Sequence, residues 1–403
     1  MKLMTAREIQ SQLDYLKYSR DDVHGYSKAI GRLFDLTASY VYDAEKAYKK
    51  GKNAVWAMGS WEVPLIYACD TIPVSYGEMG RLAGLDAITV AEDYYQLPQE
   101  SCSMVKSVIG EWHRRKAYGI KRILGTGAMC EPFNLAWEVM KKEGYDVHNI
   151  DVVYRGPGVK GERYEQLVEF FVEEIYRVAD WLTDGKGLNE DLLRYEIQRR
   201  NRLLAKMRRI MELRLKHPLY IRSLAVMYLL GGLTTYFGKP EEFTELLDQL
   251  IEEMENAPLL EGEDKIIPLV WAGGRGQEFG LYHAVDEAGG ALLGFVSTPY
   301  SRNYREDVPP VESLARFVLE GEWAGASVYS RQVIEDQIEK VNAQGLILYG
   351  YLGCSFGSVA REMWRDYFHK KGVPCISLEG TFQIGMPSGQ ILTRVKAFVE
   401  MLS

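Results

Sequence analysis

Short apolar segments alternate with helical segments in two separate parts of the chain, and this alternation constrains the fold more than any other feature. In the first part, short apolar runs predict four strands, and apolar residues at helical spacing predict three helices between them. The predicted strands are 55–58, 72–76, 122–125 and 147–154, and the predicted helices are 62–70, 101–118 and 131–143. Strands and helices that alternate in this way are typical of a parallel sheet with helices on both faces.

The alternation stops near residue 163 and resumes near residue 261. The segment between shows only helical spacing, with its clearest helices predicted at 192–217, 221–237 and 241–256. After it, the predicted strands are 266–271, 291–297, 346–350 and 373–378. The predicted helices there are 279–288, 330–343, 356–370 and 388–402.

We therefore expect an α/β fold with two doubly wound domains, 51–162 and 261–403, each built on a short parallel sheet. The segment 163–260 is predicted to be a helical linking segment, and residues 1–50 to be an N-terminal helical region. The sequence shows no clear internal repeat and no low-complexity tract.

Charge and hydropathy exclude several classes of function. The 403 residues carry 48 Lys and Arg against 56 Asp and Glu, a net charge of −8, so we expect no surface for nucleic acid or an anionic membrane. No apolar run reaches the roughly 18 residues that a transmembrane helix needs. Residues 1–10 lack the apolar stretch of a secretory signal. These features predict a cytoplasmic protein with reduced thiols.

Three of the five cysteines share a local context. Cys102, Cys130 and Cys354 each stand at the start of a predicted helix, and the last two directly follow predicted strands. In a doubly wound sheet this junction is the carboxyl edge, where ligands bind. The partial positive charge at a helix N-terminus lowers the pKa of a thiol and so favours the thiolate that binds metal.

The spacing of these cysteines and the absence of any CxxC pair do not favour a structural zinc site, whose ligands usually come in tight pairs. Three thiolates suit a [4Fe–4S] cluster with one iron free of protein ligands, which is open to a substrate oxygen. From position alone, unrelated buried cysteines remain the alternative. Cys69, inside a predicted helix, and Cys375, inside a predicted strand, are interpreted as packing residues.

Two further segments contain residues that could take part in catalysis or ligand binding. Ser60 and Glu62 follow the first predicted strand, where Ser60 could bind the substrate or an oxygen at a cluster and Glu62 could transfer a proton. A plain helix start, with a serine cap and an acidic first turn, explains them equally well. The turn 273–276, Gly-Gly-Arg-Gly, is either a tight turn after a strand or a loop whose N–H groups hold phosphate groups.

Several segments share motifs with one known family. They are 62–68 (EVPLIYA), 71–74 (TIPV), 102–107 (CSMVKS), 353–356 (GCSF), 372–374 (GVP), 378–380 (LEG) and 388–402 (SGQILTRVKAFVEML). On these segments, which span nearly the whole chain, the sequence resembles the 2-hydroxyacyl-CoA dehydratase family, which also contains subunits of ATP-dependent benzoyl-CoA reductase. Two positions depart from the family pattern: Ser103 stands where many members have proline, and 130–137 (CEPFNLAW) replaces the common CDGKKKM segment.

The resemblance implies the cluster-bearing D-component subunit of an anaerobic enzyme, with one [4Fe–4S] cluster bound by Cys102, Cys130 and Cys354. It implies a heterodimer with a homologous second subunit, and a separate ATP-hydrolysing iron–sulfur activator that injects one electron. In the dehydratases, that electron forms a ketyl radical from a (R)-2-hydroxyacyl-CoA, which loses water to give an enoyl-CoA.

Three alternatives stay open within and beyond the family. The chain could be a subunit of an aryl-CoA (benzoyl-CoA) reductase, where the electrons enter a ring, or a non-catalytic electron-relay subunit of either complex. A sugar- or nucleotide-binding α/β protein without a cluster is the alternative from another class. The chain has no GxxxxGK[ST] segment for ATP, so ATP-driven activation would have to come from another protein.

Overall fold

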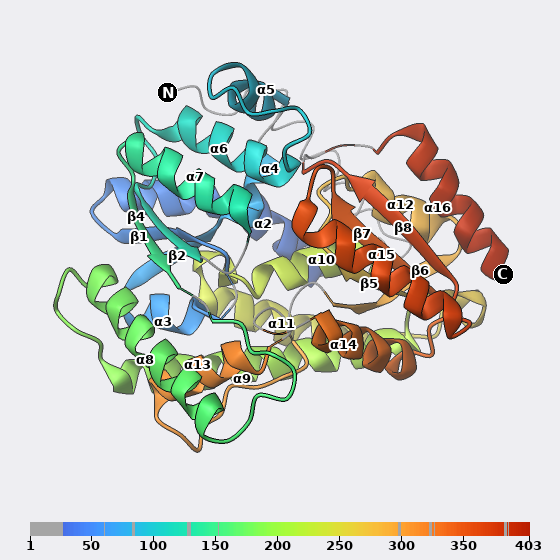
Figure 1. The fold of residues 1–403 in the computed structure, drawn as a ribbon. Coiled ribbons are helices and arrows are strands. Elements are labelled where there is room, and N and C mark those ends of the chain that lie inside the picture. Colours follow the sequence, from blue (N-terminus) through green and yellow to red (C-terminus); the bar gives the residue numbers. More distant parts are fainter. Residues whose placement is uncertain are drawn as a thin grey trace.

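The computed structural model describes residues 27–403 except 60, 83–84, 127–129, 152, 297–299, 322–324, 326, 383–384 and 386. Figure 1 shows two α/β units that lie next to each other, with long helices beneath them. This arrangement confirms the predicted fold class. Of the predicted N-terminal helical region, residues 1–26 lie outside the described part, and the rest forms helix α2 (Lys28–Lys49) with Ser27 as its cap.

The first sheet contains the four strands expected from the sequence. They are β1 (Asn53–Ala57), β2 (Thr71–Ser75), β3 (Arg122–Thr126) and β4 (Asp146–Ile150), all parallel, in the order β2-β1-β3-β4. The helices of this unit are α3 (Val63–Ala68), α4 (Met79–Leu82), α5 (Leu85–Asp93), α6 (Ser103–Arg115) and α7 (Glu131–Lys142), and η1 (Tyr76–Glu78) is a 3-10 turn. β4 is shorter than predicted and ends at Ile150.

The second sheet is built in the same way. It contains β5 (Ile267–Gly273), β6 (Gly290–Phe295), β7 (Gly345–Tyr351) and β8 (Cys375–Gly380), again parallel, in the order β6-β5-β7-β8. Its helices are α12 (Gly280–Glu287), α13 (Pro310–Leu319), α14 (Ser327–Lys340), α15 (Ser355–Lys370) and α16 (Gly389–Leu402). α13 was not predicted.

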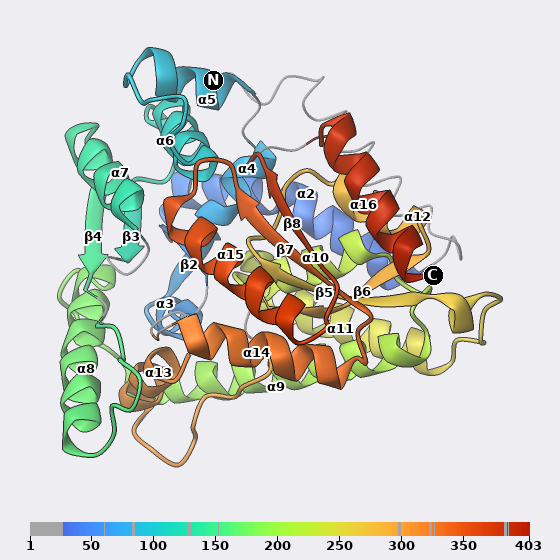
Figure 2. The ribbon, with the colours of Figure 1, turned by 45° about the vertical axis from the view of Figure 1, so that its right-hand side comes forward.

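Alternate strand residues face opposite sides of this sheet, as a parallel sheet buried on both faces requires. Val270 and Leu346 pack in a core beneath α14 and α15, together with Ile334 and Phe368 of these helices. Trp271 and Ile347, the next residues along β5 and β7, belong to the larger core on the other face. Figure 2 shows α14 and α15 over one face and α16 on the opposite side.

The two sheets therefore share one topology, although no repeat is evident in the sequence. In each, the first strand is central, the second pairs on one side and the third on the other. The second strand is added on one side of the first, and the later strands are added on the other side. The direction of strand addition therefore reverses between β1 and β3 in one sheet, and between β5 and β7 in the other. Such a switch point opens a crevice at the carboxyl ends of the two central strands, where ligands bind in α/β sheets.

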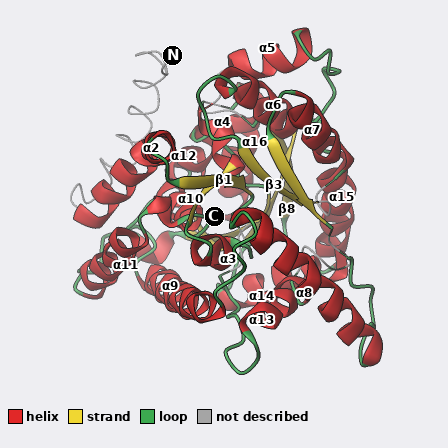
Figure 3. Cartoon of the chain, turned by 90° about the vertical axis from the view of Figure 1, so that its left-hand side faces the viewer, coloured by secondary structure: helices red, strands yellow, loops and turns green. Residues whose placement is uncertain are grey.

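The linking segment forms four helices as predicted. They are α8 (Glu162–Leu182), α9 (Glu190–Lys216), α10 (Ser223–Gly232) and α11 (Pro240–Glu255), with 3-10 turns η2 (Tyr236–Gly238) and η3 (Glu263–Lys265). Figure 3 shows how these and other helices enclose the two sheets. α13 from the second half packs against α8 and α9, so the chain returns to this helical layer.

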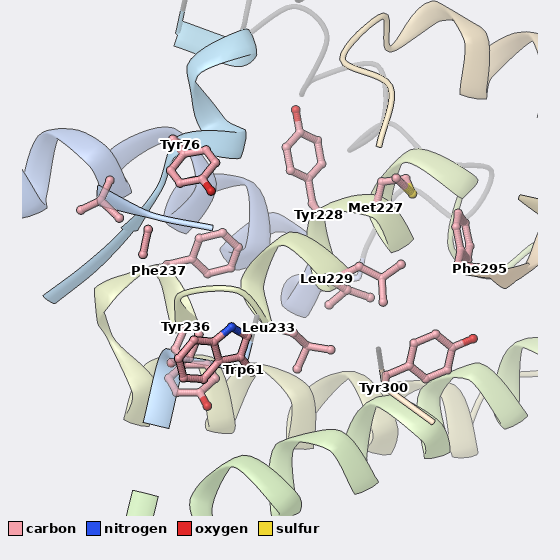
Figure 4. Close-up of a cluster of buried hydrophobic side chains, with 14 of the residues drawn as sticks. Trp61, Tyr76, Met227, Tyr228, Leu229, Leu233, Tyr236, Phe237, Phe295 and Tyr300 are labelled. Atoms are coloured by element: carbon pink, nitrogen blue, oxygen red, sulfur yellow. The ribbon is translucent and has the colours of Figure 1, made fainter. Parts of the chain in front are cut away.

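Every residue of α10 is buried, because this helix runs through the centre of the molecule. Aromatic side chains from all parts of the chain gather around it (Figure 4), among them Trp61 and Tyr76 of the first unit and Phe295 and Tyr300 of the second. One large core thus joins both sheets to the linking helices. No helix in the described ranges has both the length and the apolar character that a membrane crossing requires.

Candidate functional site

The three cysteines singled out from the sequence cap three different helices. Cys102 is the N-cap residue of α6, Cys130 of α7 and Cys354 of α15. Cys130 lies at the carboxyl edge of the first sheet, after β3, and Cys354 at the carboxyl edge of the second, after β7. Since β3 and β7 hold equivalent places in their sheets, these two cysteines stand at the two switch points.

The start of α6 lies directly against the start of α15, at the junction of the two units. The backbone N–H of Ser103 donates to the carbonyl of Leu352 over 2.9 Å. Gly353 has a left-handed φ of +74°, and a Cβ there would lie 2.7 Å from the Ser101 carbonyl oxygen and overlap that of Glu100. Only glycine allows this close approach, which brings Cys102 and Cys354 into hydrogen-bond contact.

Further hydrogen bonds hold this junction. The Ser107 hydroxyl donates to the carbonyl of Phe382 over 3.0 Å, and the N–H of Phe382 donates to the Ser103 hydroxyl over 3.2 Å. Ser103 and Ser107 are buried and lie on one face of α6 at i and i+4. Ser103, which departs from the proline of many family members, thus has a structural partner across the junction.

The two neighbouring thiols shift each other's pKa in opposite directions. The hydrogen bond from the Cys102 thiol lowers the pKa of Cys354 to about 6, aided by the backbone N–H groups of Gly357 and Phe356 at the start of α15. The Gly357 N–H lies 3.3 Å from the Cys354 sulfur. The same contact with Cys354, together with burial, raises the pKa of Cys102. A helix N-terminus therefore holds Cys354 as a thiolate, the form that binds metal.

Cys130 lies within electrostatic range of Cys354 but does not share this hydrogen bond. Burial raises the pKa of Cys130, the N–H of Phe133 opposes the rise, and the charge of Cys354 adds to it. Its side chain is half-buried, whereas Cys102 is 4% exposed. Cys354 therefore lies within electrostatic range of both Cys102 and Cys130.

The donors in this group are thiols. Within the described residues, no three or more His, Cys, Asp or Glu side chains are arranged to hold one metal ion. Three cysteines at three helix N-termini supply thiolates, the donor type that an iron–sulfur cluster uses.

The remaining cysteines behave as packing residues, in agreement with the sequence interpretation. Cys69 is the buried C-cap residue of α3, and burial raises the pKa of its thiol to about 12. Cys375 lies in β8, where its thiol donates to the Val373 carbonyl over 3.1 Å and burial raises its pKa to about 12. Burial therefore favours the protonated form of both thiols.

Of the two predicted catalytic residues, Ser60 lies outside the described residues and Glu62 is almost completely buried, with 1% of its surface exposed. The Glu62 carboxylate accepts a 2.8 Å hydrogen bond from the N–H of Gly59. Gly59 has a φ of +84° and packs against Thr234. The carboxylate therefore orders the turn after β1, as a helix-start residue does.

Glu62 also lies near the cysteine group through one tyrosine. Burial raises the pKa of Tyr76 well above its usual value, and the charges of Glu62 and Cys130 both add to the rise. Tyr76 thus lies within electrostatic range of both the carboxylate and the thiol. The position is compatible with the proton-transfer role expected from the sequence, which stays a prediction.

The turn 273–276 follows β5, the strand next to β7 at the second switch point. Trp271 donates from its indole N–H to the Gly274 carbonyl over 2.9 Å, and the Tyr351 hydroxyl donates to the Arg275 carbonyl over the same distance. The Tyr282 hydroxyl donates to the Gly276 carbonyl over 3.1 Å. Three buried aromatic side chains therefore fix three successive carbonyls, which makes this a rigid turn.

Sequence reasoning missed the polar groups beside this turn. Glu278 is buried and accepts hydrogen bonds from the N–H and hydroxyl of Thr381 and from the Tyr349 hydroxyl. Burial raises its pKa. Tyr351 lies within electrostatic range of Cys102 and Cys354. Tyr349 and Tyr351 are two residues apart at the end of a strand, a spacing that places both on one face and could have indicated a shared site.

Comparison with protein-family models gives one match. A family model described as 2-hydroxyglutaryl-CoA dehydratase, D-component, matches residues 61–402. The match covers β2, β3 and β4 of the first sheet, the whole second sheet, the linking helices and all three cysteines that cap α6, α7 and α15. Comparison with curated proteins gave no match.

Proposed function

This chain belongs to the 2-hydroxyglutaryl-CoA dehydratase D-component family, and on that basis we propose that it is the iron–sulfur subunit of an ATP-activated (R)-2-hydroxyacyl-CoA dehydratase. The reaction proposed is radical elimination of water through a substrate ketyl, giving an enoyl-CoA. Its partners would be a homologous second subunit and an ATP-dependent iron–sulfur activator.

One observation supports this proposal most strongly. Cys102 and Cys354, which are 252 positions apart in the sequence, make side-chain contact across the junction of the two units. Cys130 joins them electrostatically. A fold that brings helix-capping cysteines together from two sheets prepares thiolates for a shared ligand.

Cys102, Cys130 and Cys354 would hold the [4Fe–4S] cluster. Three protein thiolates leave one iron open, and such a cluster supplies one-electron chemistry and a Lewis-acidic iron. The chain's own residues would position and shield the substrate. The large core and the close contact of α6 with α15 exclude water from the inner side of the site.

Proton transfer is assigned to Glu62, with Ser60 as a substrate-binding hydroxyl. Glu62 is buried and held by Gly59, next to the switch point of the first sheet. A carboxylate in that position can accept a proton from a substrate bound at the carboxyl edge, provided that the turn after β1 adjusts.

The test is anaerobic purification of the chain with its partner subunit, followed by iron and sulfide analysis and turnover assays with CoA thioesters. We expect about four irons and four sulfides per chain, loss of colour and activity in air, and dehydration that requires the activator, MgATP and a reductant. A colourless, air-stable complex, or dehydration without activator and ATP at any stage, contradicts the proposal.

The ATP requirement also separates dehydration from ring reduction. A dehydratase returns its electron after each elimination, so one activation supports many turnovers. An aryl-CoA reductase consumes electrons in every cycle, so ATP hydrolysis follows product formation in fixed proportion. ATP hydrolysed per product therefore decides between the two, and a fixed ratio above one would favour the reductase. An electron-relay subunit would show no change in its cluster spectrum when substrate binds.

A further inference from the structure

The segment 380–382 at the end of β8, here called the clasp, is hydrogen-bonded to both cysteine-bearing segments of the junction. Its first carbonyl accepts the N–H of Leu352 over 2.8 Å, and Leu352 lies two residues before Cys354. Its last residue is joined by two hydrogen bonds to serine hydroxyls of α6, the helix that Cys102 caps. The clasp therefore fixes how closely the starts of α6 and α15 approach each other.

One side chain, the Glu278 carboxylate, holds the clasp in place. Its two oxygens accept hydrogen bonds from the middle residue of the clasp, Thr381: Oε2 from the N–H over 3.2 Å and Oε1 from the hydroxyl over 3.1 Å. The Tyr349 hydroxyl, from the neighbouring strand β7, donates to Oε2 over 3.3 Å. A Cβ on Gly380 would overlap both the carboxylate and this hydroxyl, so the glycine leaves the room that the carboxylate needs.

The burial of this carboxylate is costly, which indicates that its place in the fold serves a purpose. Glu278 is 7% exposed, and the three donors that the described residues give to it are uncharged. Burying a carboxylate in this way costs more free energy than burying a neutral side chain of the same shape. Glutamine could not accept both the N–H and the hydroxyl of Thr381 in the same way, because one of its two terminal atoms is a donor. The contact with Thr381 therefore needs two acceptor oxygens.

Glu278 lies at the same edge of the second sheet as Cys354. Glu278 follows β5 and Cys354 follows β7, the two adjacent strands at the switch point of this sheet. The carboxylate bonds to Thr381, and the residues on either side of Thr381 bond to the two cysteine-bearing segments. Glu278 thus acts on the cysteines through the backbone of the clasp.

We propose that Glu278 is a positioning residue, which through the clasp sets the separation and orientation of the Cys102 and Cys354 thiols. The inference rests on the proposed function where it takes these thiols as ligands of a cluster. Cys102 belongs to the first unit and Cys354 to the second, so their spacing depends on bonds between the units and not on either sheet alone. Groups that orient the ligands of a metal site control how firmly the metal is held, so loss of the carboxylate should loosen the cluster.

The first measurement follows the cluster in the complex of this chain with its partner subunit, purified anaerobically. Glu278→Gln and Thr381→Val each remove part of the hold on the clasp, and both should change the electron paramagnetic resonance spectrum of the reduced cluster. Both variants should also release iron to a chelator about tenfold faster than the wild type, the size of one lost hydrogen bond to a charged group. Thr381→Ser keeps the hydroxyl and the N–H, so it should behave as the wild type does.

Glu253→Gln is the matched control. The Glu253 carboxylate of α11 accepts hydrogen bonds from the N–H of Ala29 and the hydroxyl of Ser27 at the start of α2, so the variant removes bonds of the same kind between two helices that contain no cysteine. It should change neither the spectrum nor the rate of iron release. A purely structural role of Glu278 would lower the free energy of unfolding and leave the spectrum unchanged.

The second measurement uses the iron-free chain. Oxidised glutathione should link Cys102 and Cys354 in a disulfide: the two thiols give up two electrons and two protons, and the oxidant leaves as two reduced glutathiones. Mass spectrometry of the linked peptides measures the rate. The link should form about tenfold more slowly in Glu278→Gln and in Thr381→Val, because the two thiols are no longer held together.

The outcomes separate this inference from the proposed function. A wild-type spectrum, wild-type iron release and a wild-type rate of linkage in Glu278→Gln and Thr381→Val overturn the inference. If Glu278→Gln does not fold, Thr381→Val is compared with Thr381→Ser, and equal behaviour of these two variants overturns it. If the wild-type complex binds no iron, the proposed function fails, and the rates of linkage alone decide whether Glu278 positions the two thiols.

Discussion

At the scale of single residues, the pKa of Cys354 sets it apart from the other four cysteines. Burial raises the pKa values of Cys69 and Cys375 to about 12, and the pKa values of Cys102 and Cys130 are raised as well. The contact with Cys102 lowers the pKa of Cys354 to about 6. The sequence interpretation separated Cys69 and Cys375, as packing residues, from the other three cysteines; the structure agrees for Cys69 and Cys375, and the role of the other three as ligands stays a prediction. The sequence could not predict the contact of Cys102 with Cys354, which depends on how two distant units dock.

The first prediction follows from this division. Replacing Cys102, Cys130 or Cys354 by Ala should remove most of the about four irons bound per chain, because a cluster with only two protein thiolates dissociates. Cys69→Ala and Cys375→Ala are the matched controls and should keep their iron. Iron and acid-labile sulfide per purified chain are the measurement. Full iron retention in Cys354→Ala would refute the ligand assignment.

A second prediction at this scale concerns His283 in α12. Burial and, to a smaller extent, the charge of Arg222 lower its pKa from 6.5 to about 4. The unfolded chain therefore takes up a proton near pH 6.5 that the folded chain takes up only near pH 4. The stability that this neutral histidine contributes is present above pH 6.5 and is lost as the pH falls from about 6.5 to about 4.

The measurement is the free energy of unfolding by urea in this pH window. The wild type should lose unfolding free energy between pH 6.5 and pH 4.5, and His283→Gln should reduce this loss. The reduction is up to about 3 kcal/mol if the whole shift in the pKa of His283 is realised. Asp286 on the same helix has a pKa raised to about 6, chiefly by burial, and acts in the opposite direction, so Asp286→Asn serves as the control. If the free energy of unfolding of His283→Gln falls between pH 6.5 and pH 4.5 as much as that of the wild type, His283 does not control the loss of stability in acid.

At the scale of elements, the sequence predicted most of the structure. All eight strands were expected, because a short apolar run between two helices is typical of a strand buried on both faces of a parallel sheet. β4 was predicted too long, since the apolar residues after Ile150 continue without strand pairing. α13 was missed, although a proline and Glu312 in its first turn and apolar residues at helical spacing are local signals of a helix. Its buried face packs on α8 and α9.

The third prediction concerns the contact of α6 with α15. Gly353→Ala places a Cβ into the carbonyl oxygens of Glu100 and Ser101 at a left-handed φ of +74°. We expect a loss of about 2–4 kcal/mol of unfolding free energy and lower iron content, because Cys354 moves away from Cys102. Gly372→Ala is the matched control: its φ is +78° with nothing within 4 Å of a Cβ, so it should lose only about 1 kcal/mol from strain and keep its iron. Equal iron content in both variants would show that the contact does not position Cys354.

At the scale of the whole molecule, the two sheets repeat one topology that the sequence does not reveal. Identical strand order places Cys130 and Cys354 at equivalent edges, yet the residues around them differ: CEPFNLAW follows one strand and CSFGSVAR the other. Strand order depends on long-range pairing, and side chains that face different helices need not resemble one another.

The last prediction concerns the way in which the metal would tie the molecule together. Cys102 and Cys130 belong to the first unit and Cys354 to the second, so a cluster bound by all three joins both units at the point where α6 meets α15. A ligand that binds only the folded chain stabilises it, and the unfolded chain cannot hold three such distant thiolates in place. Iron loading of the anaerobic chain should therefore raise the midpoint of thermal unfolding by several degrees and slow proteolysis, and chelation should reverse both effects. Cys354→Ala, which leaves only first-unit ligands, should respond to neither treatment. If the loaded and iron-free chains unfold at the same temperature and are cleaved at the same rate, the cluster does not join the two units.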